Sequence, residues 1–402
     1  MGKKNILLNW ESSRSDLMEP FVALKDDFNF SVIWYKSPPG HPKRHPFEEY
    51  YFGDFHTPYE ILKKVKPDII VFFGVHSFPQ ISLNTAAKNK GIITYAMHHG
   101  VFSSNLTSIT QMRRDMGIVK QRRVISSLSS LFFYFSALRF SNRRDFGRYF
   151  KFPFLLHKYG SLAALKKCVF SSRLPDKYIQ LSPHNALFQK EMDHLDNDDK
   201  FIYIGHPHFD KFFSDLALVE KAGIKNEGYW LLVDFPNIES NIGFKKIGAE
   251  AKTDFYRRLS RYAKNDGCRL KIKLHPAGYD STFNYEDDNI ELLKDIDIVK
   301  EIVQSKRCFS FYSTLLIPII FIKQHCIVFD LGLDIGLQRE LIELGVVISL
   351  SLNSFNEEEV TKVYDVRRDV DAYNEFVRRY LYFTDGRSTE RLKNILIGDE
   401  AA

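Results

Sequence analysis

The stretch Lys66-Pro67-Asp68-Ile69-Ile70-Val71 is the part of the sequence that decides the fold class. A polar turn with a proline leads directly into a run of apolar residues, which predicts a buried strand over Asp68–Phe73. Helical patterns lie on both sides of this run, over Pro58 to Lys66 before it and over Gln80 to Asn89 after it. A nearly continuous apolar strand between two helices is typical of a parallel sheet covered by helices on both faces.

The same alternation of short apolar runs and helical patterns extends in both directions from this strand. In the first half of the chain we expect strands over Asn5–Asn9, Ser31–Tyr35, Ile92–Met97, Lys177–Leu181 and Phe201–Ile204, and a helix over 185–195. In the second half we expect strands over Tyr229–Val233, Leu270–Leu274, Cys308–Tyr312, Cys326–Phe329 and Val346–Leu350, with helices over 247–265, 291–304, 313–323 and 335–343. The sequence therefore predicts an α/β protein with two successive Rossmann-like domains facing a central cleft.

The chain of 402 residues is long enough for two domains. We place a first domain over 1–215, with a basic insertion over 113–158, and a second domain over 216–370, with the polar helical segment 211–228 as the connection. Residues 371–402 are predicted to form a helical segment that packs back on the first domain. In such sheets ligands bind at the carboxyl ends of the strands, so the residues that follow each strand are the candidates for chemistry.

Composition narrows the class of protein. Hydrophobic residues make up 44% of the chain and aromatic residues 14%, which argues against intrinsic disorder. The four cysteines form no CxxC pair, and they indicate reduced thiols of a cytoplasmic protein rather than a metal or disulfide framework. The longest apolar stretch, Val124–Leu138, is interrupted by serines and is shorter than the ~20 residues that a membrane-spanning helix needs.

The most informative motif is the strand end Lys271–Pro276, with the sequence KIKLHP, in the second domain. The imidazole of His275, at the carboxyl end of a strand, can donate a hydrogen bond or a positive charge to a phosphate oxygen. Lys273 and Pro276 belong to the same candidate site. The alternative is a structural histidine before a turn-forming proline, because His-Pro alone is a weak signal.

Two further strand ends of the second domain carry polar side chains. Ser310, Ser313 and Thr314 surround the start of a predicted helix, whose free N–H groups would bind an anion. Asp234 ends the first strand of the domain, where it could act as a nucleophile or a base. The alternatives are a simple helix cap in the first case and an aspartate that caps a turn in the second.

The strand ends of the first domain also carry polar groups. Glu11 and Arg14 follow the first strand and are candidates for contacts with an acceptor. His98 and His99 follow a later strand, where Gly100 would allow a ligand to approach the backbone closely. A buried, hydrogen-bonded histidine is the alternative for one of the pair.

Several common motifs are absent from the sequence. It contains no GxGxxG, GxxxxGK[ST], HExxH or GxSxG pattern, so the dinucleotide-cofactor version of this fold has little support. No Asp-x-Asp pair stands at a predicted strand end where it would hold a divalent cation, and 196–199 is predicted as a surface loop. We therefore expect a site that works without a metal or a cofactor.

The order of these motifs resembles bacterial GT-B glycosyltransferases of surface-polysaccharide synthesis over most of the chain. The series runs from a strand-end His-Gly through the Gly-x-Pro-x-x-Asp loop Gly205–Asp210, which holds His206, to Lys-x-His-Pro and the Ser-Thr that opens a helix. The last two look like the motifs of bacterial sialyltransferases and polysialyltransferases, which use CMP-activated sugars, and are similar to those of CDP-glycerol-dependent teichoic acid polymerases. The likeness is strongest to the retaining β-Kdo transferase domain of the WbbB type, a module of larger O-antigen enzymes that uses CMP-Kdo.

This resemblance implies a retaining transfer of Kdo from CMP-Kdo to a glycan in lipopolysaccharide, O-antigen or capsule synthesis. It implies that Asp234 forms a covalent glycosyl-enzyme, and that His275 and the helix start at Ser313 hold the CMP phosphate in the second domain. The first domain would bind the acceptor, with His206 as a candidate, and the chain would be fused to further glycosyltransferase domains. The acidic D/E-D/E-G motif of the sialyltransferases is missing, which counts against an inverting sialyltransferase.

The basic insertion 113–158 points to a further partner. It contains eleven Lys or Arg and only two Asp, with the aromatic run Leu131–Phe135 between the basic clusters. Such a segment suits an anionic membrane surface that presents a lipid-linked acceptor, and it predicts a peripheral position on the inner membrane. A solvated basic face with one buried aromatic helix is the alternative. A nucleic-acid binder is disfavoured because acidic residues are spread through the second domain and no module signature is present, and an epimerase would need more carboxylates near His275.

Overall fold

The computed structural model describes residues 2–10, 15–35, 45–98, 128–138, 142–223, 228–234, 249–274, 287–311, 313–323, 325–330, 336–362 and 369–399. These residues divide into two compact units. The first holds those up to His98, those from Leu128 to Asp210 and those from Tyr382 onward, and the second holds those from Lys211 to Leu381. The chain thus passes between the units at 210/211 and 381/382, compared with the boundaries expected at 215/216 and 370/371.

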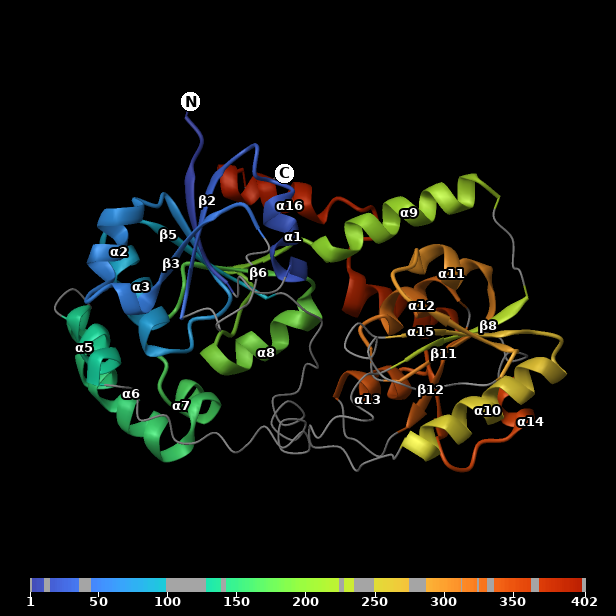
Figure 1. Cartoon of the computed structure of the whole chain (residues 1–402). Helices are drawn as coiled ribbons and strands as arrows, with labels where there is room; N and C mark the ends of the chain where they lie inside the picture. Colours follow the sequence, from blue (N-terminus) through green and yellow to red (C-terminus); the bar gives the residue numbers. More distant parts are fainter. Residues whose placement is uncertain are drawn as a thin grey trace. The chain divides into compact units, whose positions relative to one another are not determined.

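The first unit is built around a parallel sheet, which has seven strands in the part of the chain described (Figure 1). They are β1 (Asn5–Asn9), β2 (Asn29–Trp34), β3 (Glu48–Tyr51), β4 (Ile69–Phe72), β5 (Ile93–Met97), β6 (Lys177–Gln180) and β7 (Phe201–Tyr203). Their order in the sheet is β3-β2-β1-β4-β5-β6-β7. The chain first builds outward from β1 to β3 and then from β4 to β7, which is the doubly wound order of Rossmann-like sheets.

Helices connect these strands and begin where the sequence provides caps. They are α1 (Ser15–Val22), α2 (Pro58–Val65), α3 (Phe78–Asn89), α5 (Leu128–Ser136), α6 (Phe146–Tyr159), α7 (Ser161–Lys167), α8 (Pro183–Asp193) and α16 (Ser388–Ile397). The hydroxyls of Thr57, Ser77 and Ser182 accept hydrogen bonds from the first turns of α2, α3 and α8. A proline stands at the start of each of these helices, where its missing N–H costs nothing.

The C-terminal helix α16 completes the core of the first unit. Leu392 and Leu396 lie in one buried cluster with Ile6 and Leu8 of β1 and with residues of α1, so α1 and α16 cover the same face of the sheet. The opposite face carries α8, whose Ala186 lies in a second cluster with strand residues. Because both faces are covered, the central strands are apolar on both sides, as the sequence of β4 requires.

The second unit repeats the architecture around a parallel sheet of six described strands. They are β8 (Tyr229–Val233), β9 (Leu270–Lys273), β10 (Ile290–Leu293), β11 (Ser305–Ser310), β12 (Ile327–Asp330) and β13 (Ile348–Ser351), in the order β10-β9-β8-β11-β12-β13. The helices are α9 (Asp210–Lys221), α10 (Ala249–Asn265), α11 (Ile298–Gln304), α12 (Leu316–Ile322), α13 (Gly336–Glu343), α14 (Glu357–Lys362) and α15 (Val370–Phe376), followed by a π-helical turn at Val377–Leu381. The core of this unit is aromatic, with Phe255 of α10 packed against Phe311, Phe329 and Phe355.

The α/β class with two Rossmann-like domains is confirmed, whereas some elements differ from expectation. The edge strand β3 was not predicted. The helix expected over 291–304 is wrong in its first part, because Ile290–Leu293 forms β10 and pairs in parallel with β9, and only Ile298–Gln304 is helical. The helical segment expected over 371–402 is interrupted between Tyr382 and Arg387. Within the described residues, none of the helices combines the length and the apolar character needed to cross a membrane.

Candidate functional site

The candidate site lies at the carboxyl edge of the second sheet, where β8 and β11 are neighbours. Val233 at the end of β8 pairs with Ser310 at the end of β11. From this pair the sheet grows through β9 on one side and β12 on the other. Such a reversal of strand order leaves space at the strand ends, and ligands of open α/β sheets bind there.

Asp234 directly follows β8 and is the centre of a buried polar cluster. Its carboxylate accepts a hydrogen bond from the Tyr256 hydroxyl at 2.5 Å and forms an ion pair with Lys252 Nζ at 3.0 Å. Both partners come from α10, where residues four apart lie on the same face. All three residues are buried, with whole-residue relative exposures of 3% for Asp234 and 4% for Lys252. Each carboxylate oxygen therefore already has one protein partner.

Lys273, the last residue of β9, brings a second cation to this edge. Its Nζ donates a hydrogen bond to the carbonyl of Leu274 at 3.0 Å. Burial lowers the pKa of Lys273 below its ordinary value, and the carboxylates of Asp295 and Asp234 oppose that shift. The ammonium group can offer more than one donor, so it remains suited to binding a phosphate oxygen.

The serine-rich end of β11 is arranged differently from expectation. The Ser310 hydroxyl is fully buried and donates to the carbonyl of Phe311 at 3.1 Å, so it serves the fold rather than an open site. Ser313 accepts a hydrogen bond from the N–H of Leu315, and Thr314 is exposed. Helix α12 begins only at Leu316 and has seven residues, so the polar turn at Ser313 precedes the helix rather than forming its first turn.

Several predicted site residues lie outside the described residues. They are Glu11, Arg14, His99, Gly100, His275 and Pro276. Their predicted roles therefore stay predictions.

His98, at the end of β5 in the first unit, is part of a buried network. Its Nε2 lies 2.9 Å from the side-chain oxygen of Gln189 in α8, and Gln189 in turn donates to Asp193. Asp193 also accepts hydrogen bonds from Arg173 at 2.5 Å and from Tyr178 at 2.6 Å. Burial lowers the pKa of His98 below its ordinary value, although its hydrogen bond to Gln189 acts in the opposite direction. This geometry favours the structural alternative for His98 over a contact with substrate.

The loop Gly205–Asp210 anchors the C-terminal helix α16. Gly205 has φ of +81°, and a Cβ atom there would lie 2.7 Å from the hydroxyl oxygen of Ser388. The Asp210 carboxylate accepts hydrogen bonds from the backbone N–H groups of Ser388 at 2.9 Å and Thr389 at 2.6 Å. His206 is buried and stacks on Phe209, with ring centroids 4.2 Å apart. The Gly-x-Pro-x-x-Asp pattern thus has a structural explanation.

Sequence reasoning missed the partners of Asp234 and a polar group at the first sheet. Lys252 and Tyr256 stand four apart in a predicted helix, but nothing in the sequence showed that their side chains face a strand end. In the first unit, Gln80 of α3 donates to the buried Asn9 side chain at 2.8 Å, next to the β1–β4 switch of strand order. The capping box of Ser77 and Gln80 was a visible signal for this helix start.

No arrangement in the described residues resembles a metal site, since no three His, Cys, Asp or Glu side chains gather as ligands there. The four cysteines are buried thiols. Among the described residues, the charged groups at the carboxyl edge of the second sheet include Lys252, Lys273 and the Asp234 carboxylate, which can bind a phosphate and hold a sugar ring by hydrogen bonds.

Comparison with solved structures identifies the fold. The calicheamicin glycosyltransferase CalG4 matches with a TM-score of 0.57 and 13% identity, over 99% of this chain and 98% of that chain. The glycotransferase of kitacinnamycin matches with a TM-score of 0.55 and 13% identity, over 99% and 100%. A putative UDP-N-acetylglucosamine 2-epimerase from Listeria monocytogenes matches with a TM-score of 0.51 and 11% identity, over 99% and 96%. The chain has the GT-B fold.

No protein-family model matches the sequence, and no curated protein matches it either. At identities of 11% to 13%, the structural likeness establishes the architecture alone. Donor, acceptor and reaction must be argued from the residues at the strand ends.

Proposed function

We propose that the protein is a glycosyltransferase that binds a nucleotide-sugar donor at the carboxyl edge of its second sheet. The observation that carries this proposal is the cluster of Asp234, Lys252 and Lys273 beside the β8–β11 switch of strand order, in a GT-B fold. Two cations at this edge suit the phosphate of a nucleotide, and two glycosyltransferases and a putative UDP-N-acetylglucosamine 2-epimerase are named among the solved structures of similar fold.

The donor that we propose is CMP-Kdo, and the acceptor is a lipid-linked glycan of O-antigen or capsule type. Support comes from the sequence motifs around Lys273 and Ser313, which resemble those of CMP-sugar transferases. A CMP-sugar carries a single phosphate, for which Lys273 and His275 are the proposed partners. Lys273 lies at the strand end that this role requires.

The reaction that we propose is a double displacement through Asp234. One carboxylate oxygen of Asp234 forms a bond to the anomeric carbon while the bond from that carbon to the phosphate oxygen breaks, and CMP leaves with the electron pair. The acceptor hydroxyl then attacks the same carbon, loses its proton to water and releases the Asp234 carboxylate, so the configuration is retained. A phosphate is a good leaving group, so this step needs no strong general acid.

The contacts of Asp234 fit this role in one respect and constrain it in another. Lys252 and Tyr256 fix the orientation of the carboxylate, and a carboxylate has about four lone-pair positions, so acceptor capacity remains. Its side chain is only 1% exposed, however. The proposed reaction therefore requires the anomeric carbon of the donor to reach a carboxylate that is buried at the end of β8. Trapping of a sugar on Asp234 is therefore the decisive observation.

The test is to incubate the protein with CMP-Kdo or CMP-sialic acid and to measure both the product and the mass of the intact enzyme. We expect an adduct with the mass of one Kdo residue, which Asp234→Asn abolishes. The matched control is Asp254→Asn, a change on the exposed face of α10 that should leave the adduct in place. An Asp234→Asn protein with full transfer activity would overturn the mechanism, and adduct or product with CMP-sialic acid alone would overturn the donor.

A nucleotide-sugar epimerase is the second candidate, because one solved structure of similar fold is named as a putative UDP-N-acetylglucosamine 2-epimerase. Thermal unfolding with CMP, CDP, UMP and UDP separates the two. Stabilisation by CMP supports the proposed donor, whereas stabilisation by UDP together with interconversion of UDP-sugars would favour the epimerase. Stabilisation by CDP would favour the polymerase type that transfers glycerol phosphate.

A further inference from the structure

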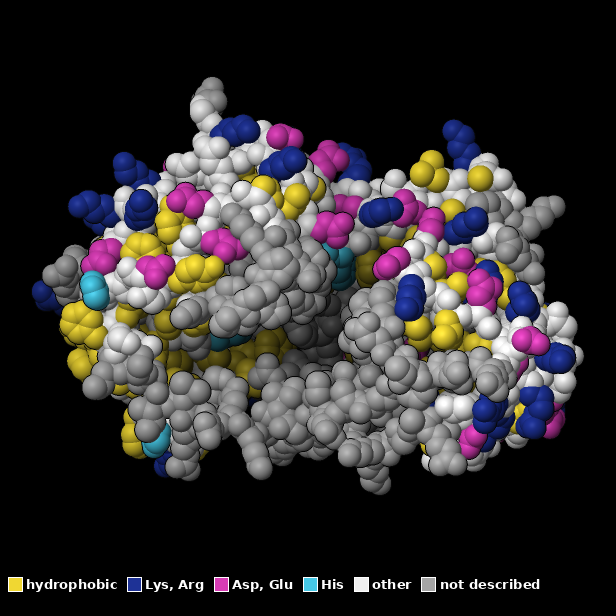
Figure 2. Space-filling model, viewed as in Figure 1, with side chains coloured by type: hydrophobic (Ala, Val, Ile, Leu, Met, Phe, Trp, Pro, Cys, Tyr) yellow, Lys and Arg dark blue, Asp and Glu magenta, His cyan; other side chains and the backbone are white. Residues whose placement is uncertain are grey.

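The outer surface of α5 and α6 exposes an unusual number of large aromatic side chains. Phe132 is 64% exposed, Phe150 59% and Phe154 62%, with Phe146 at 37%. We call these four residues the aromatic face. Phe146, Phe150 and Phe154 follow one another at intervals of four, so they form a stripe along α6, and Phe135 of α5 joins it by stacking on Phe150 at 5.2 Å. Figure 2 shows hydrophobic side chains at the surface over this end of the first unit.

This stripe is separate from the buried side of the same helices. Tyr134 of α5 stacks on Tyr149 of α6 with ring centroids 4.2 Å apart and packs on Phe78 of α3. Phe152, on the same inner side, is fully buried. Helix α6 is therefore apolar on two opposite sides, and only the inner one is used by the fold. Exposed apolar patches of this kind usually mark a contact surface.

The charges of the segment that carries the phenylalanine stripe are almost all positive. Between residues 142 and 167, all of which the structure describes, the only acidic residue is Asp145, and it is buried. The cations of the same segment are Arg143, Arg144, Arg148, Lys151, Lys158, Lys166 and Lys167. Lys151 and Lys158 are exposed and lie on the outer half of α6, beside the phenylalanine stripe.

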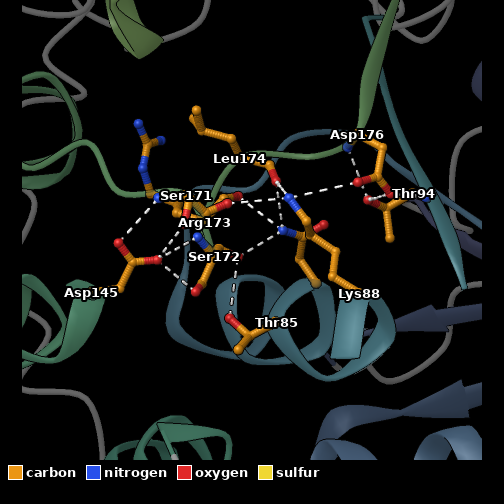
Figure 3. Close-up of polar contacts among 10 residues, drawn as sticks. Thr85, Lys88, Thr94, Asp145, Ser171, Ser172, Arg173, Leu174 and Asp176 are labelled. Atoms are coloured by element: carbon orange, nitrogen blue, oxygen red, sulfur yellow. Dashed lines mark hydrogen bonds and ion pairs between the residues drawn. The ribbon is translucent and has the colours of Figure 1, made fainter. Parts of the chain in front are cut away.

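A polar anchor connects the start of α6 to α3 through the loop at 171–174 (Figure 3). At the start of α6, the Asp145 carboxylate accepts hydrogen bonds from the hydroxyls of Ser171 and Ser172, each at 2.7 Å. Thr85 and Lys88 of α3 donate to carbonyls of the same loop. The aromatic face is thus presented on a fixed support.

We propose that the aromatic face of α5 and α6 docks on an anionic lipid bilayer. The phenylalanines would enter the boundary between headgroups and acyl chains, and the flanking lysines and arginines would contact lipid phosphates. Helix α6 has 14 residues and is about 21 Å long, and its stripe from Phe146 to Phe154, about 12 Å long, can lie in the plane of the interface. This inference depends on surface chemistry alone and not on the sugar that the protein transfers.

Charge decides between a bilayer and other occupants. A second copy of the chain docked face to face would bring two sets of like charges together, with no exposed carboxylate between residues 142 and 167 to compensate them. A nucleic acid would neutralise the cations but offers no apolar phase for a row of phenylalanines. An anionic membrane provides both an apolar layer and negative charge.

The experiment is sedimentation of the full chain with phosphatidylcholine vesicles, with and without phosphatidylglycerol, over a range of salt concentrations. We expect binding only to the anionic vesicles, weakening as salt rises. The double variant Phe150→Ser/Phe154→Ser should lower the partition coefficient at least about tenfold, since two phenylalanines no longer enter the lipid. Lys151→Glu/Lys158→Glu should lower it by about 25-fold or more, at roughly fivefold for each charge lost.

Two matched controls keep the outcome interpretable. Leu218→Ser removes an equally exposed apolar side chain from α9, and Lys63→Glu/Lys64→Glu reverses exposed charges on α2 in the first unit. Both should bind anionic vesicles like the wild type, and the aromatic variant should keep the wild-type melting temperature because its changes are exposed.

Three results would overturn the proposal. The first is a wild-type protein that does not bind anionic vesicles, and the second is an aromatic variant that binds them as strongly as the wild type does. The third is an oligonucleotide that displaces the protein from the vesicles and binds the wild type and the aromatic variant with equal affinity. Loss of a dimer in the aromatic variant, without loss of vesicle binding, would instead assign the face to a second copy. None of these readouts requires donor turnover, so failure of the proposed sugar chemistry leaves the test intact.

Discussion

Asp234 is held between a cation and a phenol, and this arrangement ties the stability of the second unit to the proposed chemistry. The Lys252 ammonium and the Tyr256 hydroxyl are both buried with it. Removing charges from water is costly, so a buried pair is stable only while both partners remain. The same contacts that would orient a nucleophile therefore also hold α10 against β8.

Replacing Lys252 by Met should destabilise the second unit strongly. The change leaves the Asp234 carboxylate buried without its counter-charge, which costs about 3 to 5 kcal/mol in comparable cases. Tyr256→Phe removes one hydrogen bond to a charged group and should cost less, about 1.5 to 3 kcal/mol. Urea unfolding followed by the fluorescence of the buried Trp230 would measure both. Lys264→Met, on the exposed side of α10, is the control, and an equal loss in that variant would contradict the argument.

The buried imidazole of His98 should make the first unit less stable in mild acid. Its pKa is lowered by burial, so below the ordinary value of about 6.5 the unfolded chain binds a proton that the folded chain does not. Stability is therefore present at neutral pH and falls as the pH drops through about 6.5. The melting temperature should decline more steeply between about pH 7 and 5 in the wild type than in His98→Gln. Parallel profiles would show that His98 is not responsible.

At the same scale, the sequence indicated some site residues and not their partners. Asp234 and Lys273 were predictable because a polar residue at the end of an apolar strand lies at the carboxyl edge of a parallel sheet. The partners of Asp234 on α10 were not, since the rotation of a helix against a sheet is set by packing between distant segments. The orientation of Ser310 was not predictable for a related reason, because its hydroxyl turns inward to a backbone carbonyl.

At the scale of elements, the caps of α16 explain how a helix far away in sequence is fixed to the first unit. Asp210 accepts hydrogen bonds at the N-terminus of α16, and Lys4 Nζ donates to the last two helical carbonyls at 3.2 and 3.0 Å. Negative charge at the N-terminus and positive charge at the C-terminus both complement the helix dipole. These two residues therefore form hydrogen bonds with terminal backbone N–H and C=O groups that have no partner within the helix.

Asp210→Ala should loosen α16 by about 1 kcal/mol, the usual value of a lost N-terminal cap. Hydrogen exchange measured by mass spectrometry should show faster exchange in the peptide over Ser388–Ile397. Asp210→Asn should restore part of the protection, because its amide oxygen can still accept one N–H. The control is Asp215→Ala, which removes only a surface pair with Lys211. Unchanged exchange in α16 of the Asp210→Ala protein would contradict the capping role.

The elements that were missed share a physical cause. Ile290–Leu293 consists of residues that favour helices as readily as strands, and it becomes β10 because it pairs with β9 at the sheet edge. Glu48–Tyr51 forms the edge strand β3 and has no buried residue to give it an apolar pattern. By contrast, β1 and β8 match their predicted bounds, since a continuous apolar run in a central strand is visible in the composition of the sequence.

For the whole molecule, the path of the chain determines which parts should unfold together. The first unit is assembled from both ends of the described chain, because Leu392, Ile395 and Leu396 belong to the same buried cluster as Ile6 and Leu8. The second unit, from Lys211 to Leu381, has its own cluster around Trp230 and Phe255. Truncation near the C-terminus should therefore destabilise the first strands of the chain rather than the adjacent second unit.

Ending the chain after Leu381 should unfold the first unit and spare the second. The loss of three buried aliphatic side chains, at about 1.5 to 3 kcal/mol each, approaches the total stability of a typical domain, about 5 to 15 kcal/mol. Peptides from β1 and β4 should then exchange their amide hydrogens rapidly, while peptides from β8 and β11 stay protected. A chain that ends after Asp399 keeps α16 and should match the full-length protein. If β8 and β11 lost protection together with β1, the two units would form one cooperative structure, and the division of the chain at Asp210 would describe its architecture without describing its stability.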